Sequence, residues 1–469
     1  MGHAQQKDLT VGTPWKVLLI FSIPIFLGNL VQMAYSWGDS VFVGQLGATA
    51  FSAVGASANL IYPATIFAQG LPAGLGNFTS QLFGAKDIKA VRHSYGISIL
   101  INLIVGSIMT MVTLLLVPAF LAAGGISSGT ALYDYSRIYM YVMLGGLLGT
   151  FFLYFYQNFM RAIGDAVLQF VSMGVYAAVN ILLDFLFIWV AHWGVMGCAL
   201  AFVASTVIAS IASYFLVYLK YPELHLRKDD FKYDRKFIHN HLRIGIPLAL
   251  EFSILAIGVM AMQRSIDGYG TAAINGYYAG SRVDYLLCTF IIAYGYSLGA
   301  FCGQNYGAKQ YKRVKDGISQ SMVVLLIQSV IQIVLTFLVR DKAAFFFLAN
   351  PDAETIKYCR IYLYWDMAGY LLLNMIYLGR NALSAIGKPS VSFWSGVTEM
   401  VWRFIGALVL TIPYGVVAAL GAQSMAWIFA GIVNFVGFIV FVYAKPIFKK
   451  NESLVSETKI PQPGPTIVK

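Results

Sequence analysis

The chain has 469 residues, of which 58% are hydrophobic and only 11% are charged, and its mean hydropathy is +0.70. A water-soluble protein of this length cannot bury so much apolar surface in its core, whereas a lipid bilayer can cover it. The formal net charge is +11, but the Lys and Arg residues lie at the ends of apolar runs, which argues for membrane topology and against nucleic-acid binding.

Apolar runs of about twenty residues, the length that crosses a bilayer, recur along the whole chain. We predict twelve transmembrane helices near residues 16–38, 48–80, 94–118, 135–157, 166–190, 196–219, 244–266, 272–303, 317–340, 356–379, 390–413 and 421–443. If the N-terminus is cytoplasmic, about three quarters of the 32 Lys and Arg residues fall in cytoplasmic segments, as the positive-inside rule requires. The sequence therefore predicts an all-α, multi-pass inner-membrane protein with both termini in the cytoplasm.

The two halves of the chain repeat each other. One constant spacing separates three pairs of motifs: Ile23-Pro24 and Ile246-Pro247, Gly84-Ala85-Lys86 and Gly307-Ala308-Lys309, and Ala162-Ile163-Gly164 and Ala385-Ile386-Gly387. We expect a cytoplasmic N-terminal segment (1–13), a six-helix bundle (14–219), a charged cytoplasmic linker (220–243), a second six-helix bundle (244–443) and a cytoplasmic tail (444–469). Because each half has an even number of spans, the halves are parallel, and such halves usually enclose a central cavity.

Six acidic residues fall inside the predicted spans or, for Asp39, one residue beyond a span: Asp39, Asp184, Glu251, Asp284, Asp366 and Glu399. A charged side chain at the bilayer centre costs about 2.5–3.5 kcal/mol even on insertion scales. We therefore expect these side chains to face a water-filled cavity, to pair with a base or to be protonated.

Asp39 and Asp184 are the main candidates for ion coupling. The rise of 1.5 Å per helical residue places both in the outer part of the membrane, at a similar depth. Tyr35 precedes Asp39 by four residues, and Asn180 precedes Asp184 by four, so each pair shares one helix face. Neighbouring carboxyl groups can carry a proton, and the same oxygens with an amide carbonyl also suit Na⁺. The alternative is that Asp39 ends its helix in water and that Asp184 caps a helix pair.

The polar candidates of the second half are Glu251, Asp284, Glu399 and Arg403. Glu399 and Arg403 form an i,i+4 pair, whose simplest interpretation is a buried ion pair without a transport role. Asp284 follows Arg282 and finds a cation either there or in a second-half cavity. The role of Glu251 stays open.

Pro24 and Pro247 lie inside apolar runs at equivalent places of the repeat. A proline removes a helical hydrogen bond and favours a kink, which acts either as a static bend or as a hinge. The aromatic clusters Tyr154-Phe155-Tyr156 and Tyr294 with Tyr296 either line a cavity for flat cations or belong to interfacial belts.

Sequence motifs of enzymes are missing. We find no nucleotide-binding loop, no nucleophile elbow and no His-Glu-x-x-His motif, and the four cysteines form no Cys-x-x-Cys pair. We therefore predict free thiols, no enzymatic activity, no cofactor and no metal site, apart from Na⁺ as an alternative coupling ion at Asp39, Asp184 and Asn180. A membrane-embedded enzyme would need a catalytic cluster in a loop.

Several stretches together resemble the multidrug and toxic compound extrusion (MATE) family, near its bacterial DinF-like branch. The resemblance covers about residues 14–445 and is carried by Gly28-Asn29-Leu30-Val31-Gln32, Asp39-Ser40-Val41-Phe42-Val43-Gly44, Ala53-Val54-Gly55, Gln81-Leu82-Phe83-Gly84-Ala85-Lys86-Asp87, Arg161-Ala162-Ile163-Gly164-Asp165, Asn180 with Asp184, Gln304-Asn305-Tyr306-Gly307-Ala308 and Arg380-Asn381-Ala382-Leu383.

This resemblance implies a V-shaped pair of six-helix bundles that expels amphipathic, often cationic compounds in exchange for H⁺ or Na⁺. It also implies that Asp39 and Asp184 couple transport, with Tyr35, Asn158 and Asn180 around them. One departure weakens the Na⁺ alternative, because this chain has Phe202 where the family often has a threonine.

The resemblance leaves a second hypothesis, a flippase for lipid-linked precursors from the same superfamily. Such proteins tend to have more spans and a strongly basic cavity, whereas this chain has twelve predicted spans and few arginines within them. We expect a monomer in a bacterial inner membrane that takes small-molecule substrates and binds no nucleic acid.

Overall fold

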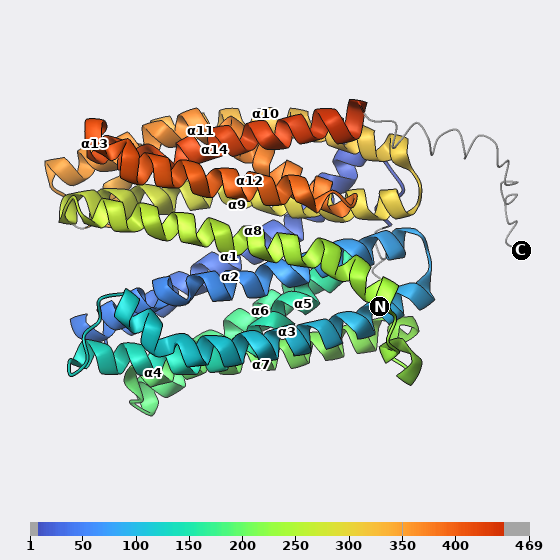
Figure 1. Ribbon diagram of the computed structural model, residues 1–469, viewed down its shortest axis with the longest axis horizontal. Coiled ribbons are helices and arrows are strands. Elements are labelled where there is room, and N and C mark those ends of the chain that lie inside the picture. Colours follow the sequence, from blue (N-terminus) through green and yellow to red (C-terminus); the bar gives the residue numbers. More distant parts are fainter. Residues whose placement is uncertain (1–7, 349, 445–469) are drawn as a thin grey trace, which may run out of the picture.

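The computed structural model describes residues 8–348 and 350–444, and this part of the chain is helical without strands (Figure 1). The predicted tail at 444–469 lies outside the described residues, except for its first residue. The long helices are α1 (Pro14–Gly44), α2 (Ala48–Gly84), α3 (Ile88–Ala123), α4 (Ala131–Gly145), α5 (Leu147–Ala162), α6 (Ala166–Asp184), α7 (Gly194–Lys220), α8 (Arg235–Asp267), α9 (Thr271–Gly307), α10 (Tyr311–Val339), α11 (Ala353–Ala385), α12 (Pro389–Phe404) and α14 (Val416–Phe438).

Shorter elements extend or connect these helices. They are the π-helical turns η1 (Phe185–Val190), η5 (Ile405–Val409) and η6 (Ile439–Ala444), the 3-10 turns η2 (Pro222–Leu224), η3 (Lys228–Phe231) and η4 (Ala343–Phe346), and α13 (Thr411–Tyr414). In both halves the fifth span, α6 or α12, runs into a π-helical turn, a feature that is frequent at functional sites.

The described helices account for twelve membrane spans, as predicted. Nine are long and apolar enough to cross a bilayer, or ten when α4 and α5 count as one bent span. The other two are α11, whose interior carries charged residues, and α12, which has 16 residues and continues into η5.

The predicted single run at 135–157 is wrong in one respect, since it contains two helices that meet at 46°. A Cβ atom at Gly146 would collide with Val203, so the glycine lets α7 approach the bend closely.

The helices form two bundles, α1–α7 and α8–α14, which lie one above the other in Figure 1. The repeat is visible in the backbone, because left-handed residues recur at equivalent positions. Lys86 (φ 59°) corresponds to Lys309 (φ 57°), and Gly47 (φ 96°) corresponds to Gly270 (φ 90°). The two bundles are therefore copies of one backbone plan, related by a pseudo-twofold axis.

One end of the molecule carries residues 221–234, which connect the bundles, and we call it the linker end. There the bundles meet through a symmetric crossing of α2 and α9. A Cβ on Gly84 would collide with the carbonyl oxygen of Gln304, and a Cβ on Gly307 would collide with that of Gln81. The two glutamine side chains also donate hydrogen bonds across the contact, Gln81 to the carbonyl oxygen of Ala385 (2.6 Å) and Gln304 to that of Ala162 (2.9 Å).

Helices α1 and α8 each contact both bundles. Helix α1 packs on α6 of its own half and on α9 of the other, and α8 packs on α12 and on α2. Pro24 and Pro247 lie inside these two helices. The predicted proline positions therefore belong to the elements that join the bundles.

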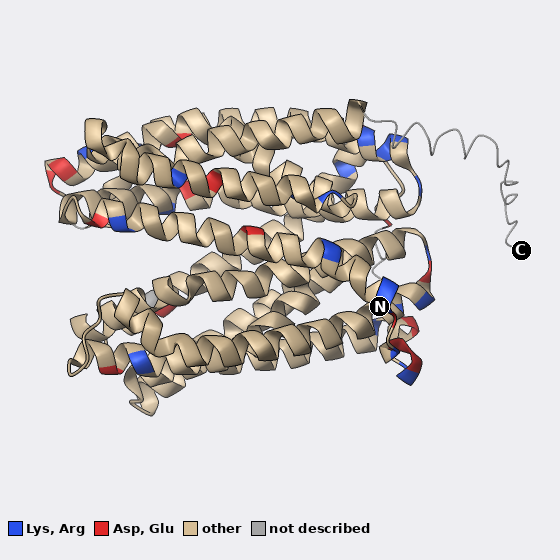
Figure 2. Ribbon diagram, in the orientation of Figure 1, with Lys and Arg blue, Asp and Glu red and all other residues tan. Residues whose placement is uncertain are grey.

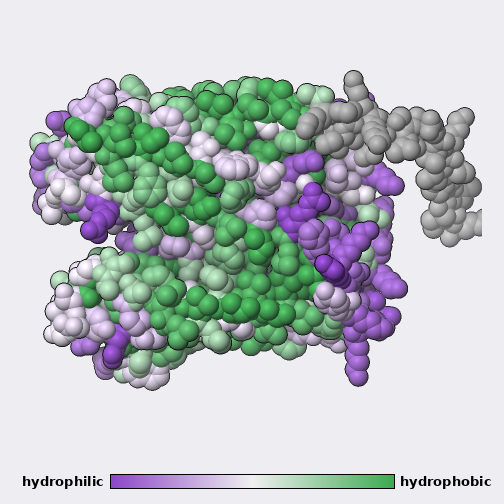
Figure 3. Space-filling model, viewed as in Figure 1, coloured by the Kyte–Doolittle hydropathy of each residue, from purple (hydrophilic) through white to green (hydrophobic). Residues whose placement is uncertain are grey.

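Basic residues are distributed unevenly between the two ends of the molecule. Lys and Arg residues gather near the linker end, and the sides between the two ends carry few charges (Figure 2). Figure 3 shows an apolar belt on these sides and a hollow between the bundles at the end opposite the linker, which we call the open end. This distribution matches that of a membrane-embedded V, closed at the linker end.

Candidate functional site

A cavity of about 350 Å³ is lined mainly by the second bundle, and Tyr62, Ile66 and Gln69 of α2 are its lining residues from the first bundle. Its walls are mainly aromatic and aliphatic, and its polar lining includes Tyr62, Asp284, Arg380, Asn381, Glu399 and Arg403. Tyr296 lines it as predicted for an aromatic cavity, whereas Tyr294 is buried in the core and bonded to Ser321 (3.1 Å). The cavity has the mixture of apolar walls and few polar groups that is typical of small-molecule sites.

The structure brings Asp39 and Asp184 together inside the first bundle. A carboxylate oxygen of each and the Sγ atom of Cys198 all lie within 4.8 Å of one another. Asp39 lies on α1 five residues before its end, Asp184 is the last residue of α6, and Cys198 lies in the second turn of α7. Three helix ends thus converge at the open end, because alternate spans run in opposite directions.

The environment of this acid pair lacks hydrogen-bond donors. Both oxygens of Asp184 and the amide oxygen of Asn180 are buried without a donor among the described residues, and Asp39 receives only a weak thiol contact from Cys198 at 3.8 Å. No Lys or Arg forms an ion pair with either acid in the described part of the chain. Two carboxylates this close repel each other when both are ionised, and uptake of a proton or a cation relieves that repulsion.

Aromatic rings cover the acid pair on the side toward the linker end. Tyr35 packs edge-on against Tyr176, with 5.0 Å between the ring centroids, and Tyr176 packs against Phe202 at 6.2 Å. The residue that replaces the family threonine is thus a packing residue here. Asn180 lies one turn before Asp184 on the same face of α6, as the sequence spacing predicts.

The second bundle contains a chain of alternating charges. Arg380 Nε lies 2.5 Å from Glu251, Arg380 Nη2 donates to Glu399 Oε1 (3.0 Å), and Arg403 Nη2 lies 3.2 Å from Glu399 Oε2. All four side chains are buried. Glu399 and Arg403 therefore do form the predicted i,i+4 pair, and Glu251 has a partner that its sequence neighbours did not reveal. We call these four residues the charge ladder.

Two further acids of the second bundle are buried near the cavity. Asp284 Oδ1 accepts a contact from Cys288 Sγ at 3.4 Å, and Asp366 Oδ1 accepts a hydrogen bond from Ser424 (2.8 Å). Asp284 does not pair with Arg282, which is exposed. Residues two apart point to different sides of a helix, so the cavity alternative for Asp284 is the correct one.

Asn158 does not belong with the acid pair, contrary to the prediction. It lies near the linker end of α5, where it accepts a hydrogen bond from Arg161 Nη2 (2.5 Å). The acids lie near the opposite ends of their helices. The prediction was wrong because it rested on motif similarity, which does not give the depth of a residue in the membrane.

Sequence reasoning missed three residues that the structure brings into these sites. Cys198 was considered only as a free thiol, although its place early in α7 matches the depth of Asp39. Arg380 lies one residue beyond the predicted span 356–379, whereas α11 continues to Ala385 and carries it into the bundle. Arg161 lies at a helix end, where a basic residue normally needs no explanation.

Comparison with known proteins agrees with this architecture. The sequence model of the MatE family matches residues 24–186 and again residues 247–417, one match in each half. The chain is 27% identical over 403 residues to the "Probable multidrug resistance protein YpnP" of Bacillus subtilis, covering 82% of this chain and 87% of that protein. It is 25% identical over 399 residues to a "FAD transporter" of Shewanella oneidensis, covering 82% and 85%.

Among solved structures, the fold is similar to the "Outward-facing conformation of a multidrug resistance MATE family transporter of the MOP superfamily". The TM-score is 0.85 at 20% identity, and the match covers 96% of this chain and 100% of that one. Because the family model matches both halves and the relatives span most of the length, this chain belongs to the MatE family of multidrug and toxic compound extrusion transporters.

Proposed function

We propose that the protein exports amphipathic, mostly cationic compounds through the central cavity in exchange for H⁺ or Na⁺ that binds between Asp39 and Asp184. The observation that carries this proposal is the acid pair, in which two carboxylates and a thiol lie within 4.8 Å without a basic partner among the described residues. Binding of a positive charge lowers the free energy of such a site, because it offsets the repulsion between the two carboxylates. The energy of an ion gradient can therefore enter the protein here.

The composition of the cavity supports a cationic substrate. Within the charge ladder, two glutamates balance two arginines, so the ladder adds no net charge to the cavity wall. Asp284 lines the same cavity without a basic partner among the described residues. The cavity is also lined by the aromatic residues Tyr62, Tyr285, Tyr296 and Trp427, and aromatic rings attract cations.

The charge distribution supports an orientation. Lys and Arg gather at the linker end (Figure 2), and such residues remain on the cytoplasmic side of inner membranes. The structure then represents a state open to the outside of the cell. Pro24 and Pro247 become candidate hinges, because α1 and α8 contact both bundles and must bend or tilt when the V reverses.

A proteoliposome experiment tests the proposal. Efflux of the fluorescent cation rhodamine 123 is measured under a pH gradient alone and under a Na⁺ gradient alone, for the wild type, Asp39→Asn and the control Asp134→Asn. Asp134 is an exposed acid in the first turn of α4. We expect one gradient to drive efflux, Asp39→Asn to abolish that drive and Asp134→Asn to keep it.

Other outcomes would reject parts of the proposal. Gradient-driven efflux that survives in Asp39→Asn would show that the acid pair does not couple transport. If the folded wild type moves no dye under either gradient but binds polyprenyl-phosphate sugars, the flippase hypothesis replaces the exporter hypothesis. Efflux by protein reconstituted at one chain per vesicle would agree with our expectation of a functional monomer, since each chain contains both bundles.

A further inference from the structure

A pocket of about 480 Å³ lies on the surface of the linker end, where the start of α1 meets the loop between α9 and α10 and the first turns of α10. Its lining residues are Pro14, Lys309, Gln310, Tyr311, Lys312, Arg313 and Asp316. Three of these residues are basic and one is acidic, so the lining carries an excess of positive charge. We call it the basic pocket.

The basic pocket has an equivalent in the first half, and there the chain itself supplies an anion. Residues 84–93 correspond to residues 307–316 at the constant spacing of the repeat. The connection between the bundles places Asp230 on α3, where its carboxylate lies 2.6 Å from Arg92 Nε. Only 3% of Asp230 is exposed. In the first half, a carboxylate of the protein therefore neutralises part of this basic stretch.

In the second half, the lysines and the arginine of the pocket have no such partner among the described residues. Lys309, Lys312 and Arg313 form no ion pair with an acid there. Where the first half has Asp87 directly before α3, the second half has the uncharged Gln310 directly before α10. The basic pocket is thus a positively charged surface that lacks the anion of its repeat-related counterpart.

The helices that flank the pocket, α1 and α10, are both long and apolar enough to cross a bilayer. Trp15 at the start of α1 is exposed, as is typical of residues at the membrane interface. Farther along, α1 exposes Ile20 and Ile23, and α10 exposes Val323 and Leu326. A molecule with its charged group in the pocket can therefore lay apolar chains along these helices. Phospholipids have this shape, whereas soluble phosphates offer only the charged group.

We propose that the basic pocket binds the phosphate of an anionic phospholipid, of which phosphatidylglycerol is the simplest example. Lys309 and Lys312 are exposed, and lysine side chains bind phosphate as mobile point charges. Basic residues beside a membrane span attract anionic lipids in the same way. The inference does not depend on which solute the protein moves or on its coupling ion.

Arg313 connects the pocket to residues 8–13, which we call the N-terminal strap. Its Nη2 atom donates to the carbonyl oxygen of Leu9 (3.2 Å), and its Nη1 atom donates to that of Gly12. Asn305 donates to the same Leu9 oxygen (3.1 Å), and the Leu9 side chain is fully buried in a core cluster made mainly by the second bundle. A phosphate in the pocket would therefore attract the guanidinium that holds the strap.

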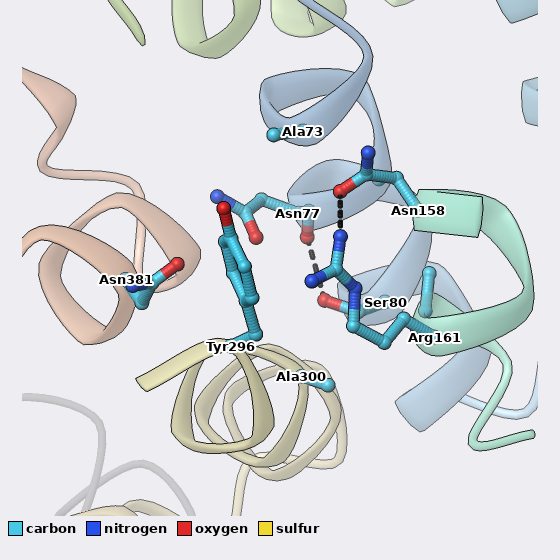
Figure 4. A pocket seen from close by; sticks show the side chains of 10 residues that line it. Ala73, Asn77, Ser80, Asn158, Arg161, Tyr296, Ala300 and Asn381 are labelled. Atoms are coloured by element: carbon cyan, nitrogen blue, oxygen red, sulfur yellow. Dashed lines mark hydrogen bonds between the residues drawn. The ribbon is translucent and has the colours of Figure 1, made fainter. Parts of the chain in front are cut away.

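The strap in turn contacts the seam that closes the linker end. The N–H of Leu9 donates to Gln304 Oε1 (3.3 Å), and Gln304 Nε2 donates across the seam to the carbonyl oxygen of Ala162 (2.9 Å). Farther from the linker end, Arg161 of the first bundle lies against the Tyr296 ring of the second, with 4.1 Å between Cζ and the ring centroid (Figure 4). These contacts separate if the linker end opens, so a lipid in the basic pocket should favour the closed linker end.

The test measures lipid binding to the full-length protein in dodecyl maltoside micelles. Phosphatidylglycerol, phosphatidylcholine and sn-glycerol 3-phosphate are titrated, and bound molecules are counted by native mass spectrometry. The variant is Lys309→Gln with Lys312→Gln, and the matched control is Lys86→Gln with Lys89→Gln at the repeat-related positions. All four lysines are exposed, so each double variant removes two surface charges and leaves the core intact. Amide hydrogen exchange of the N-terminal strap is followed with and without lipid.

We expect the wild type to bind phosphatidylglycerol more tightly than phosphatidylcholine, on the order of tenfold, and more tightly than glycerol 3-phosphate. Lys309→Gln with Lys312→Gln should raise the Kd for phosphatidylglycerol about tenfold, because two of the three cations of the pocket are lost. In the control the Kd should stay within about twofold of the wild type. Phosphatidylglycerol should slow exchange of the strap amides in the wild type and in the control, but not in the pocket variant.

Four results would overturn the inference. Equal loss of phosphatidylglycerol in both double variants would show that overall charge attracts the lipid, and equal binding of both lipids by the wild type would show that no anionic headgroup is recognised. Displacement of phosphatidylglycerol by an equal concentration of glycerol 3-phosphate would assign the pocket to soluble phosphates. Unchanged exchange of the strap in lipid-saturated wild type would reject the link to the closed linker end.

A single substitution provides the same comparison if the double variant does not fold. Lys312→Gln should raise the Kd for phosphatidylglycerol about threefold, since it removes one basic residue, and Lys89→Gln is its control. Equal Kd values in these two variants would again overturn the inference.

Discussion

In the first bundle, α6 carries Tyr176 and Asn180 at the positions where α12 of the second bundle carries Glu399 and Arg403. Glu251 on α8 likewise corresponds to Gly28 on α1. The acids of the first bundle have apolar counterparts, since Asp39 corresponds to Met262 and Asp184 to Ala407. The two bundles therefore share one backbone plan but place buried charge at different positions.

The consequence lies in how each bundle balances its charges. The charge ladder contains as many bases as acids, and each of its acids lies within ion-pair distance of a base. The acid pair has no base among the described residues, so its negative charge falls only when protons or cations bind. The two halves therefore share a scaffold but differ in charge balance, and our proposal assigns ion binding to the bundle that lacks the bases.

The largest expected effect comes from breaking the ladder. Arg380→Gln leaves Glu251 and Glu399 without their shared cation, and loss of one partner of a buried pair costs about 3–5 kcal/mol. We expect a clearly lower midpoint of thermal unfolding in detergent. Arg264→Gln, at an exposed arginine, should leave the midpoint unchanged, and an equal shift in both variants would contradict a special role for the ladder.

Removing one charged group from the acid pair should raise the stability of the protein, whereas removing one from the charge ladder lowers it. Asp184→Asn removes one of two facing carboxylates, whose repulsion at this separation is on the order of 1–3 kcal/mol. We expect this variant to be as stable as the wild type at acid pH, where both carboxyl groups of the wild type are protonated, and more stable than the wild type at alkaline pH without Na⁺. The check is the unfolding midpoint as a function of pH, with Asp134→Asn as control. If the unfolding midpoint of Asp184→Asn lies below that of the wild type at alkaline pH, the ionised pair stabilises the fold and our expectation is wrong.

A double substitution can convert the first bundle toward the second. The counterpart of Tyr35 is Gly258, where a Cβ would lie only 3.2 Å from Arg403 Cδ, so the glycine makes room for that arginine. Tyr35→Gly with Asn180→Arg should place a guanidinium beside Asp184. We expect a pH-independent unfolding midpoint and about a tenfold loss of ion-driven efflux, or about 1.4 kcal/mol.

Tyr35→Gly alone is the control for the double variant, because it opens the space without adding a charge. It should keep the pH dependence of unfolding. If the unfolding midpoint of the double variant also depends on pH, then the absence of a basic residue beside the acid pair does not explain the pH dependence.

The smallest effect is expected at Asp366. Ser424→Ala removes the hydroxyl that donates to Asp366 Oδ1 at 2.8 Å, and loss of one such hydrogen bond costs about 1 kcal/mol. We expect a small drop in the unfolding midpoint and unchanged coupling. Thr398→Ala, whose hydroxyl is exposed and bonds only to its own helix, should have less effect. Loss of coupling in Ser424→Ala would instead assign ion binding to the second bundle.

Much of the fold follows from local sequence patterns. The apolar runs mark the spans, because backbone groups in lipid must be paired within a helix. The constant spacing from Pro24 to Pro247 and from Gly84 to Gly307 indicates the two equal halves. Bends are harder to predict, since the 46° angle between α4 and α5 depends on Val203 of a different helix at Gly146.

For the candidate site, the sequence predicted how deep the two acids lie in the membrane but not which side chains surround them. Counting along α1 and α6 gives Asp39 and Asp184 a similar height in the membrane, since helical rise is constant. Counting does not give the direction in which a side chain points relative to other helices. Counting therefore did not connect Cys198 with the acids. The family resemblance, not the counting, grouped Asn158 with them, although that residue lies near the linker end of α5.

The sequence alone determined a twelve-span, two-fold repeated membrane protein whose buried acids need neutralisation, because hydropathy, spacing and the cost of buried charge are properties of single helices. Only the tertiary structure decided which charges meet. It joined Glu251 to Arg380, brought Asp39 and Asp184 together and, within the described residues, gave Arg161 no acidic partner. Partners on different helices are selected by packing across the whole molecule, and that information is not present in any one span.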